Sequence, residues 1–193
     1  ICVSQLLQYF DTNIIICEQG GELMRTEGCE YMKFEGDQFH RTKMLNEMAR
    51  AAKTQFIANW DCDVVIPPMQ LLEAVNKLRA GAEMVYPYDG IFHRIRHKDK
   101  HRMTDDIGVF GSDRPDGTQS FGGAILWNKQ AFMQIGMENE YMISFGPEDV
   151  ERMERAIKLG VRIERQSGNL YHFAHWCGPD SSVSNPLFRK NRE

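Results

Sequence analysis

The sequence has no Cys-x-x-Cys pair and only five cysteines in 193 residues. Because that count is odd, neither a disulfide framework nor a structural zinc knot is indicated, and a reducing compartment is expected. The longest apolar run has about five residues, whereas a membrane-spanning helix needs about 20. Basic residues are not in excess, since 23 Lys and Arg stand against 27 Asp and Glu. This balance excludes a general nucleic-acid binder, because phosphate neutralisation needs a basic surface.

The chain does contain enough apolar material for a folded domain. Hydrophobic residues make up 42% of the sequence and charged residues 26%, which excludes a mostly disordered chain. A chain of this length forms one domain or two small ones at most, and no internal repeat divides it. We therefore expect a single domain over residues 1–193.

Short apolar segments alternate with amphipathic ones along the chain. The predicted strands occupy residues 13–18, 31–34, 55–60, 83–88, 122–127, 161–165 and 171–175. The predicted helices occupy residues 1–10, 39–53, 67–81, 129–135 and 147–160. This order favours an α/β fold with parallel strands and covering helices. Residues 91–106 and the tail from Pro179 are expected to be loops.

Asp61-Cys62-Asp63 directly follows one of the predicted strands. Ligands collect at the carboxyl ends of strands in open α/β sheets, so this pair of acids is a candidate site. Carboxylate oxygens suit a hard divalent cation such as Mn²⁺ or Mg²⁺ that bridges a diphosphate. An Asp-x-Asp pair is also common at a solvated strand end that leads into a helix, and this interpretation stays open.

Two more acids, Glu148 and Asp149, begin the predicted helix that follows Pro147. Acids at this place complement the helix dipole, which explains them without any function. A carboxylate there can also act as a general base that takes a proton from a substrate hydroxyl. The residues expected to contact the core from this helix are Val150, Met153, Ile157 and Leu159.

Five of the six histidines fall into two groups. His93, His97 and His101 are spaced by four, which on a helix would place them on one face. The basic residues between them favour instead a solvated loop that attracts anions. His172 and His175 would add imidazole nitrogen to an oxygen site, a mixture that suits Mn²⁺, or would pack in partly buried positions.

Residues 39–68, FHRTKMLNEMARAAKTQFIANWDCDVVIPP, resemble β-1,4-galactosyltransferases and bacterial capsule and chondroitin-type glycosyltransferases of the GT-A fold. That family shows a similar Phe-x-Arg-x-Lys-x-Leu-Asn helix, then a strand and Asp-x-Asp. The segments at 16–19, 121–132 and 147–149 are similar to further family motifs in the same order. The resemblance covers about residues 13–188 and implies a Rossmann-like mixed sheet with helices on both faces.

The resemblance also implies roles for individual residues. Asp63 and His175 would bind the metal, with His172 as a weaker candidate. The implied contacts of the nucleotide-sugar are Asp61, Arg41, Lys43, Gly122 and Gly123. Glu148 and Asp149 would bind the acceptor, with Asp149 as the base.

Some positions depart from the family pattern. The family's first strand, with its uridine-pocket arginine, is expected upstream of Ile1. Phe145 stands where the family has Trp, Pro147 where it has Gly, and Val150 where it has an acid. These differences bear on acceptor stacking and on the loop before Glu148.

Together these features predict a metal-dependent, inverting glycosyltransferase that moves a sugar from a UDP-sugar to a glycan hydroxyl in capsule or surface polysaccharide synthesis. Mn²⁺ or Mg²⁺ would be the cofactor, and Trp60, Phe145 or Trp176 would stack on sugar faces. The alternatives are a non-catalytic nucleotide-sugar or carbohydrate-binding module and, third, a nucleotidyltransferase. We expect the bacterial cytoplasm, with peripheral membrane association left open, and the Golgi lumen as the alternative compartment.

Overall fold

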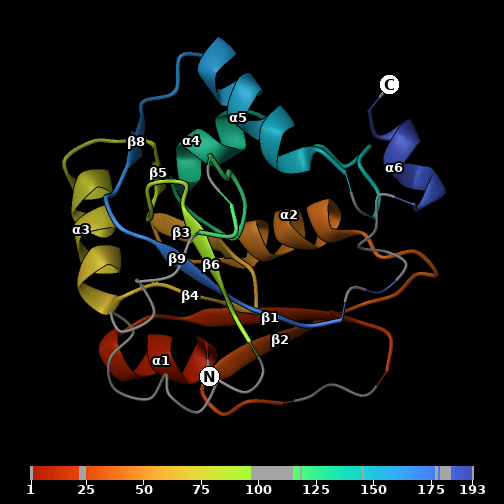
Figure 1. Cartoon of the computed structure of the whole chain (residues 1–193), viewed down its shortest axis with the longest axis horizontal. Coiled ribbons are helices and arrows are strands. Elements are labelled where there is room, and N and C mark those ends of the chain that lie inside the picture. Colours follow the sequence, from red (N-terminus) through yellow and green to blue (C-terminus); the bar gives the residue numbers. More distant parts are fainter. Residues whose placement is uncertain are drawn as a thin grey trace.

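The computed structural model describes residues 2–21, 25–96, 115–117, 119–144, 146–176, 178 and 184–192 (Figure 1). The helices are α1 (Cys2–Tyr9), α2 (Arg41–Ala51), α3 (Pro68–Arg79), α4 (Lys129–Gln134), α5 (Glu148–Lys158) and α6 (Pro186–Lys190). The strands are β1 (Ile14–Gln19), β2 (Cys29–Phe34), β3 (Phe56–Trp60), β4 (Val64–Val65), β5 (Met84–Tyr86), β6 (Phe92–Ile95), β7 (Ala124–Asn128), β8 (Ile163–Arg165) and β9 (Leu170–Phe173). Within these residues, no helix combines the length and apolarity that crossing a bilayer requires.

The central sheet has the strand order β3-β7-β5-β8. β7 runs antiparallel to both β3 and β5, and β5 runs parallel to β8. The sheet is therefore mixed, as the GT-A resemblance implied, and the expectation of parallel strands from the strand–helix order was wrong for β7. The apolar pattern of β7 does not reveal its direction, because a strand buried on both faces is hydrophobic in either orientation.

Two smaller sheets complete the strand pairing. β1 and β2 pair in parallel, and β4, β9 and β6 form a three-stranded sheet. β4 runs antiparallel to β9, which places Val64 opposite His172 and Val65 opposite Tyr171. Through this pairing, residues beside Asp63 meet residues from near the end of the chain.

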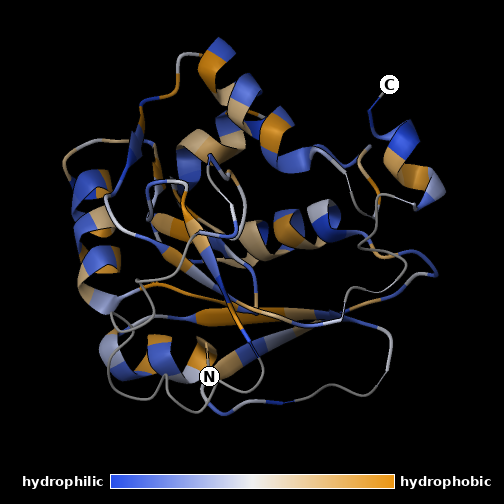
Figure 2. Ribbon diagram, in the orientation of Figure 1, coloured by the Kyte–Doolittle hydropathy of each residue, from blue (hydrophilic) through white to orange (hydrophobic). Residues whose placement is uncertain are grey.

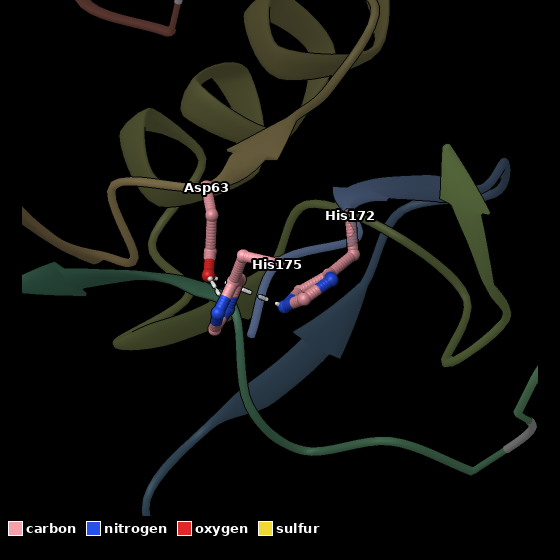
Figure 3. A group of neighbouring side chains, drawn as sticks. All are labelled: Asp63, His172 and His175. Atoms are coloured by element: carbon pink, nitrogen blue, oxygen red, sulfur yellow. Dashed lines mark ion pairs between the residues drawn. The ribbon is translucent and has the colours of Figure 1, made fainter. Parts of the chain in front are cut away.

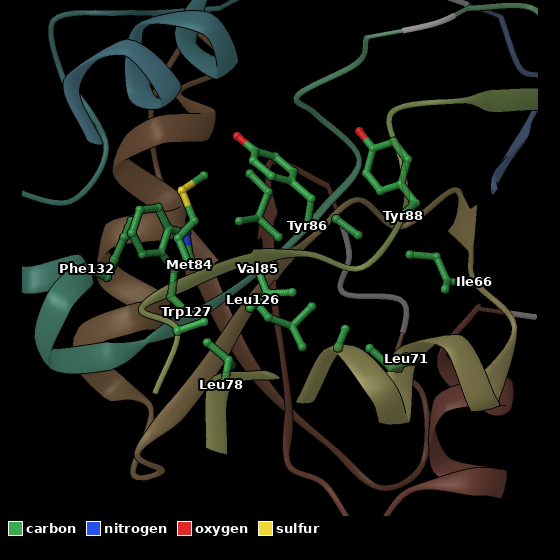
Figure 4. Close-up of a cluster of buried hydrophobic side chains, with 14 of the residues drawn as sticks. Ile66, Leu71, Leu78, Met84, Val85, Tyr86, Tyr88, Leu126, Trp127 and Phe132 are labelled. Atoms are coloured by element: carbon green, nitrogen blue, oxygen red, sulfur yellow. The ribbon is translucent and has the colours of Figure 1, made fainter. Parts of the chain in front are cut away.

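The hydrophobic core lies where α3 and α4 pack against the central sheet (Figure 4). Met84, Tyr86 and Trp127 are fully buried on β5 and β7, and Phe132 of α4 lies against Trp127. Hydrophobic residues dominate β1 and β4, whereas the helices alternate hydrophobic and hydrophilic residues (Figure 2). This core holds rigid the strand ends from which the candidate site residues project.

Two segments that were expected to be loops contain regular structure. β6 lies within the predicted loop at 91–106, of which residues 97–106 fall outside the described part, and His93 is therefore on a strand and not on a helix. The tail contains α6, which Asn185 caps by accepting the N–H of Leu187 at 2.8 Å. An Asn followed by Pro is a helix-start signal, so α6 could have been predicted.

Helix α5 begins where it was predicted but presents a different face to the core. Its buried residues are Glu148, Arg152 and Ala156. The apolar residues Val150, Ile157 and Leu159 are 44%, 59% and 59% exposed. The prediction that these three contact the core was wrong, whereas Met153 does pack against it. The helix turns charged side chains inward, and this orientation builds part of the candidate site.

Candidate active site

Asp63, His172 and His175 lie together where β4 meets β9 (Figure 3). Asp63 Oδ2 is 3.3 Å from His172 Nε2 and 2.7 Å from His175 Nε2. One ligand atom from each residue lies within 4.8 Å of the other two. The structure therefore brings the second acid of Asp-x-Asp and both late histidines to one point, as the sequence predicted.

Backbone pairing accounts for this convergence. Asp63 ends the turn before β4, and its carbonyl accepts the N–H of Phe173 at 2.8 Å. Val64, the next residue, lies opposite His172. His175 follows β9, and its Nδ1 lies 2.9 Å from the carbonyl of Trp176, which directs Nε2 toward Asp63. A second-shell bond of this kind fixes the tautomer and ring orientation of a metal-binding histidine.

The electrostatics of the group suit a divalent cation. Burial by itself would raise the pKa of Asp63, but the hydrogen bond with His172 and the charge of both imidazoles bring this pKa below its ordinary value. Asp63 Oδ1 and His172 Nδ1 are buried without a hydrogen-bond partner. One ionised carboxylate with two imidazoles is a donor set that fits Mn²⁺.

Arg41 connects the first acid of Asp-x-Asp with the acids of α5. Its Nη2 lies 2.5 Å from Asp61 Oδ1, and its Nη1 lies 3.6 Å from Glu148 Oε1 and 3.9 Å from Asp149 Oδ1. Asp61 therefore faces the α5 acids, while Asp63 faces the histidines. One guanidinium partly offsets the repulsion among these three carboxylates.

Gly122 and Gly123 lie against the same acids. A Cβ added at Gly122 would collide with Asp149 Oδ2, so only glycine leaves room for this carboxylate. Gly123 has φ +83°, a conformation that L side chains rarely adopt, and its carbonyl accepts the N–H of Asp61 at 2.8 Å. Both glycines thus permit a close approach of backbone to Asp61 and Asp149.

Known proteins resemble this chain in sequence and fold. A family model described as the N-terminal domain of galactosyltransferase matches residues 113–176. The catalytic domain of Drosophila β1,4-galactosyltransferase 7, solved in complex with xylobiose, matches 80% of this chain with a TM-score of 0.50 and 16% identity. A mycobacterial protein matches 95% of this chain with a TM-score of 0.53 and 13% identity. No curated protein matches the sequence.

The fold is that of the GT-A glycosyltransferases. The chain spans 64% of the length of each of the two solved structures. The site lies where the GT-A resemblance predicts it, at the strand end marked by Asp-x-Asp. The individual roles of the site residues stay predictions.

Some candidate residues lie apart from the acids and histidines of this GT-A site. Lys43 Nζ lies 5.4 Å from the centre of the Phe34 ring, because residues two apart on α2 point in different directions. Trp60 packs against the core and donates its indole N–H to the carbonyl of Val64 at 3.2 Å. Trp176 is 83% exposed, and Phe145 falls outside the described residues.

Sequence reasoning missed a buried ion pair behind Asp149. Arg152 Nη2 lies 2.6 Å from Asp149 Oδ1, and Arg152 Nη1 lies 2.9 Å from Glu138 Oε1. Glu138 and Arg152 are both almost fully buried. The available signal was the spacing, since Arg152 follows Glu148 by one helical turn and so shares its face.

Glu148 differs from its neighbour Asp149 in its surroundings. Its Oε2 is buried without a hydrogen-bond partner. Burial, and after it the charge of Asp149, raise the pKa of Glu148 to about 7, although Arg41 acts in the opposite direction. Glu148 thus changes its charge near neutral pH.

Replacing Glu148 with Gln is expected to remove a pH-dependent contribution to stability. Between pH 4.5 and about 7 the folded protein keeps this proton while the unfolded chain loses it. The free energy of unfolding of the unchanged protein therefore falls with rising pH in this window, by up to about 3 kcal/mol relative to Glu148→Gln. Urea denaturation of both proteins from about pH 4 to about pH 8 measures the difference. A difference that stays constant over this range would contradict the assignment.

Proposed function

We propose that this chain is a metal-dependent, inverting glycosyltransferase that moves a sugar from a UDP-sugar to a glycan hydroxyl. The main support is the convergence of Asp63, His172 and His175 beside the acids that Arg41 holds together. The family match to a galactosyltransferase domain supports sugar transfer. A role in capsule or surface polysaccharide synthesis is part of this proposal.

Asp63, His172 and His175 would hold the metal. Their mixed oxygen and nitrogen donors favour Mn²⁺, with Mg²⁺ as the alternative. When bound, the metal would neutralise the charge that develops on the leaving diphosphate. The unpartnered, buried Asp63 Oδ1 is consistent with a ligand at this point.

Asp149 would act as the general base. Its side chain is 31% exposed, so a substrate hydroxyl can reach it, whereas the side chain of Glu148 is only 10% exposed. Asp149 would take the proton of the acceptor hydroxyl, whose oxygen attacks the anomeric carbon as the bond to the diphosphate breaks. Attack from the face opposite the leaving group inverts the configuration at that carbon. Arg41 and Asp61 would contact the donor.

A carbohydrate would be the acceptor. The similar Drosophila enzyme was solved in complex with xylobiose. Trp176 directly follows His175 and is exposed, so its ring can stack on a sugar face, whereas Trp60 is held in the core. Residues 1–193 would form one transferase domain, with the family's first strand upstream of Ile1. The bacterial cytoplasm, with a peripheral membrane association, stays the predicted location.

UDP release tests this function directly. The full chain is incubated with Mn²⁺, a panel of UDP-sugars and oligosaccharide acceptors, and UDP is measured over time. Release that needs both the acceptor and Mn²⁺, and that stops when EDTA is added, is the expected result. Binding of UDP-sugars without release would favour the non-catalytic module instead.

The same proposal predicts stabilisation by the metal. Because a ligand that binds only the folded state stabilises it by RT ln(1 + [L]/Kd), Mn²⁺ at 100 times its Kd adds about 2.7 kcal/mol. Thermal unfolding with Mn²⁺ should show a rise in Tm that EDTA reverses, and UDP should raise Tm further. An unchanged Tm at millimolar Mn²⁺ would contradict a metal site at Asp63.

A further inference from the structure

Helix α5 buries charge in place of apolar surface. Arg152 is 0% exposed, although Val150 and Ile157 on the same helix remain exposed and were available to fill the core. A buried ion pair contributes little stability compared with well-packed apolar residues, because removing both charges from water is costly. The orientation of α5 therefore calls for an explanation other than stability.

The contacts of Arg152 supply one. Its Nη1 donates to both carboxylate oxygens of Glu138, at 2.9 Å and 3.0 Å. Its Nη2 donates to Asp149 Oδ1 at 2.6 Å and to the carbonyl of Phe121 at 3.1 Å. One rigid guanidinium thus joins a buried acid, a partly exposed acid and the backbone just before Gly122.

Glu138 is itself fixed by two other elements. Asn59 of β3 donates to Glu138 Oε1 at 2.8 Å. Asn46 of α2 accepts the N–H of Glu138 at 2.9 Å and donates to its carbonyl at 3.0 Å. The acid that anchors Arg152 is therefore held by the helix and the strand that flank Arg41 and Asp61.

The guanidinium stays charged in this position. Burial alone would lower the pKa of Arg152, but Glu138 and then Asp149 raise it above its ordinary range. Arg152 thus provides a permanent positive charge on the buried side of Asp149. The second oxygen, Oδ2, lies over Gly122, where a side chain would fill the space.

We propose that Arg152, anchored by Glu138, is a positioning residue that holds Asp149 by Oδ1 and leaves Oδ2 over Gly122 for the acceptor proton. This inference rests on the proposed function for the role of Asp149. Arg152 itself touches no substrate, since its side chain is 1% exposed. Its effect is on the placement of Asp149, and a displacement of about 1 Å can cost about 10²-fold in rate.

Arg152→Lys tests this role, because lysine keeps the charge but cannot bond Glu138, Asp149 and Phe121 together. We expect kcat for transfer to fall about 100-fold, while the Kd for UDP with Mn²⁺ changes less than about twofold. Glu138→Gln is the second variant, since the amide keeps the size of the side chain and an acceptor for Asn59. It should lower the same parameter by a smaller factor.

Arg155→Lys is the matched control. Arg155 lies on the same helix and bonds Glu151 and the carbonyls of Ile135 and Met137, but not Asp149. Its replacement should lower Tm and leave kcat unchanged. If the Arg152 and Glu138 variants lose UDP affinity by the same factor as kcat, or lose no more kcat than the control, the positioning role is wrong.

Crystal structures separate this inference from the proposed function. If the unchanged protein releases no UDP from any UDP-sugar, the proposed function fails, and the structure of a folded variant still tests the placement of Asp149. In Arg152→Lys, or in Glu138→Gln if the lysine variant does not fold, the Asp149 carboxylate is expected to move away from Gly122. An unmoved carboxylate would overturn the inference.

Discussion

Replacing Asp63 with Ala is expected to abolish metal-dependent sugar transfer. Asp63 Oδ2 is the atom that both His172 and His175 approach, so its loss removes the anionic ligand of the proposed site. A metal's contribution to a transition state is several kcal/mol, and each 1.36 kcal/mol is a factor of ten in rate. We therefore expect kcat/KM to fall by about 10³-fold or more, measured as UDP release at saturating Mn²⁺.

Metal binding itself supplies an independent measurement for this variant. Titration with Mn²⁺, followed by its electron paramagnetic resonance signal, should show a Kd at least about 100-fold weaker in Asp63→Ala. Asp37→Ala is the matched control, because Asp37 is exposed and lies outside the site. Full activity of Asp63→Ala at saturating donor, in a protein that binds Mn²⁺ normally, would show that the metal ligands are elsewhere.

Replacing Asp149 with Asn is expected to lower turnover without weakening donor binding. Asparagine has the same shape and can still contact Arg152 and Gly122, but its amide cannot take a proton at neutral pH. General base catalysis contributes about 10²–10⁴-fold, so kcat should fall within that range. Steady-state kinetics with varied acceptor measures kcat, and calorimetric titration with UDP and Mn²⁺ measures donor affinity.

The control for Asp149→Asn comes from the same helical turn. Glu151 is also an acid in the first turn of α5, but it pairs with Arg155 at 2.7 Å and not with Arg152. Glu151→Gln removes the same helix-dipole interaction and should leave kcat near that of the unchanged protein. If both variants lose activity equally, the acids act on helix stability alone. If Asp149→Asn loses UDP affinity instead of kcat, the base is another group.

Local signals predicted most of the secondary structure correctly. The apolar run before Asp61, the pair Pro67-Pro68 and the stop near Gly81 identify β3, α3 and its end. These signals act over a few residues, through backbone conformation and side-chain periodicity. The direction of β7 in the sheet and the inward turn of α5 depend on partners far along the chain, so neither could be predicted in this way.

The candidate site shows the same division. Motif types and their order, strengthened by the resemblance to GT-A enzymes, pointed to Asp61, Asp63, Glu148, Asp149 and the late histidines. Arg152 was missed because its burial depends on Glu138, which Asn46 and Asn59 fix from other elements. A charged residue in a helix is ordinarily exposed, and only packing shows when it is not.

By itself the chain specified which side chains exist for this chemistry and which of them stand at strand ends and helix starts, because those properties depend on near neighbours along the backbone. Only the tertiary structure decided that β4 pairs with β9, which brings Asp63 to His172 and His175. It also decided that Arg41 separates the two acids of Asp-x-Asp into two different groups. Distances between residues so far apart in sequence are set by long-range strand pairing and core packing, whose cost and gain no local pattern contains.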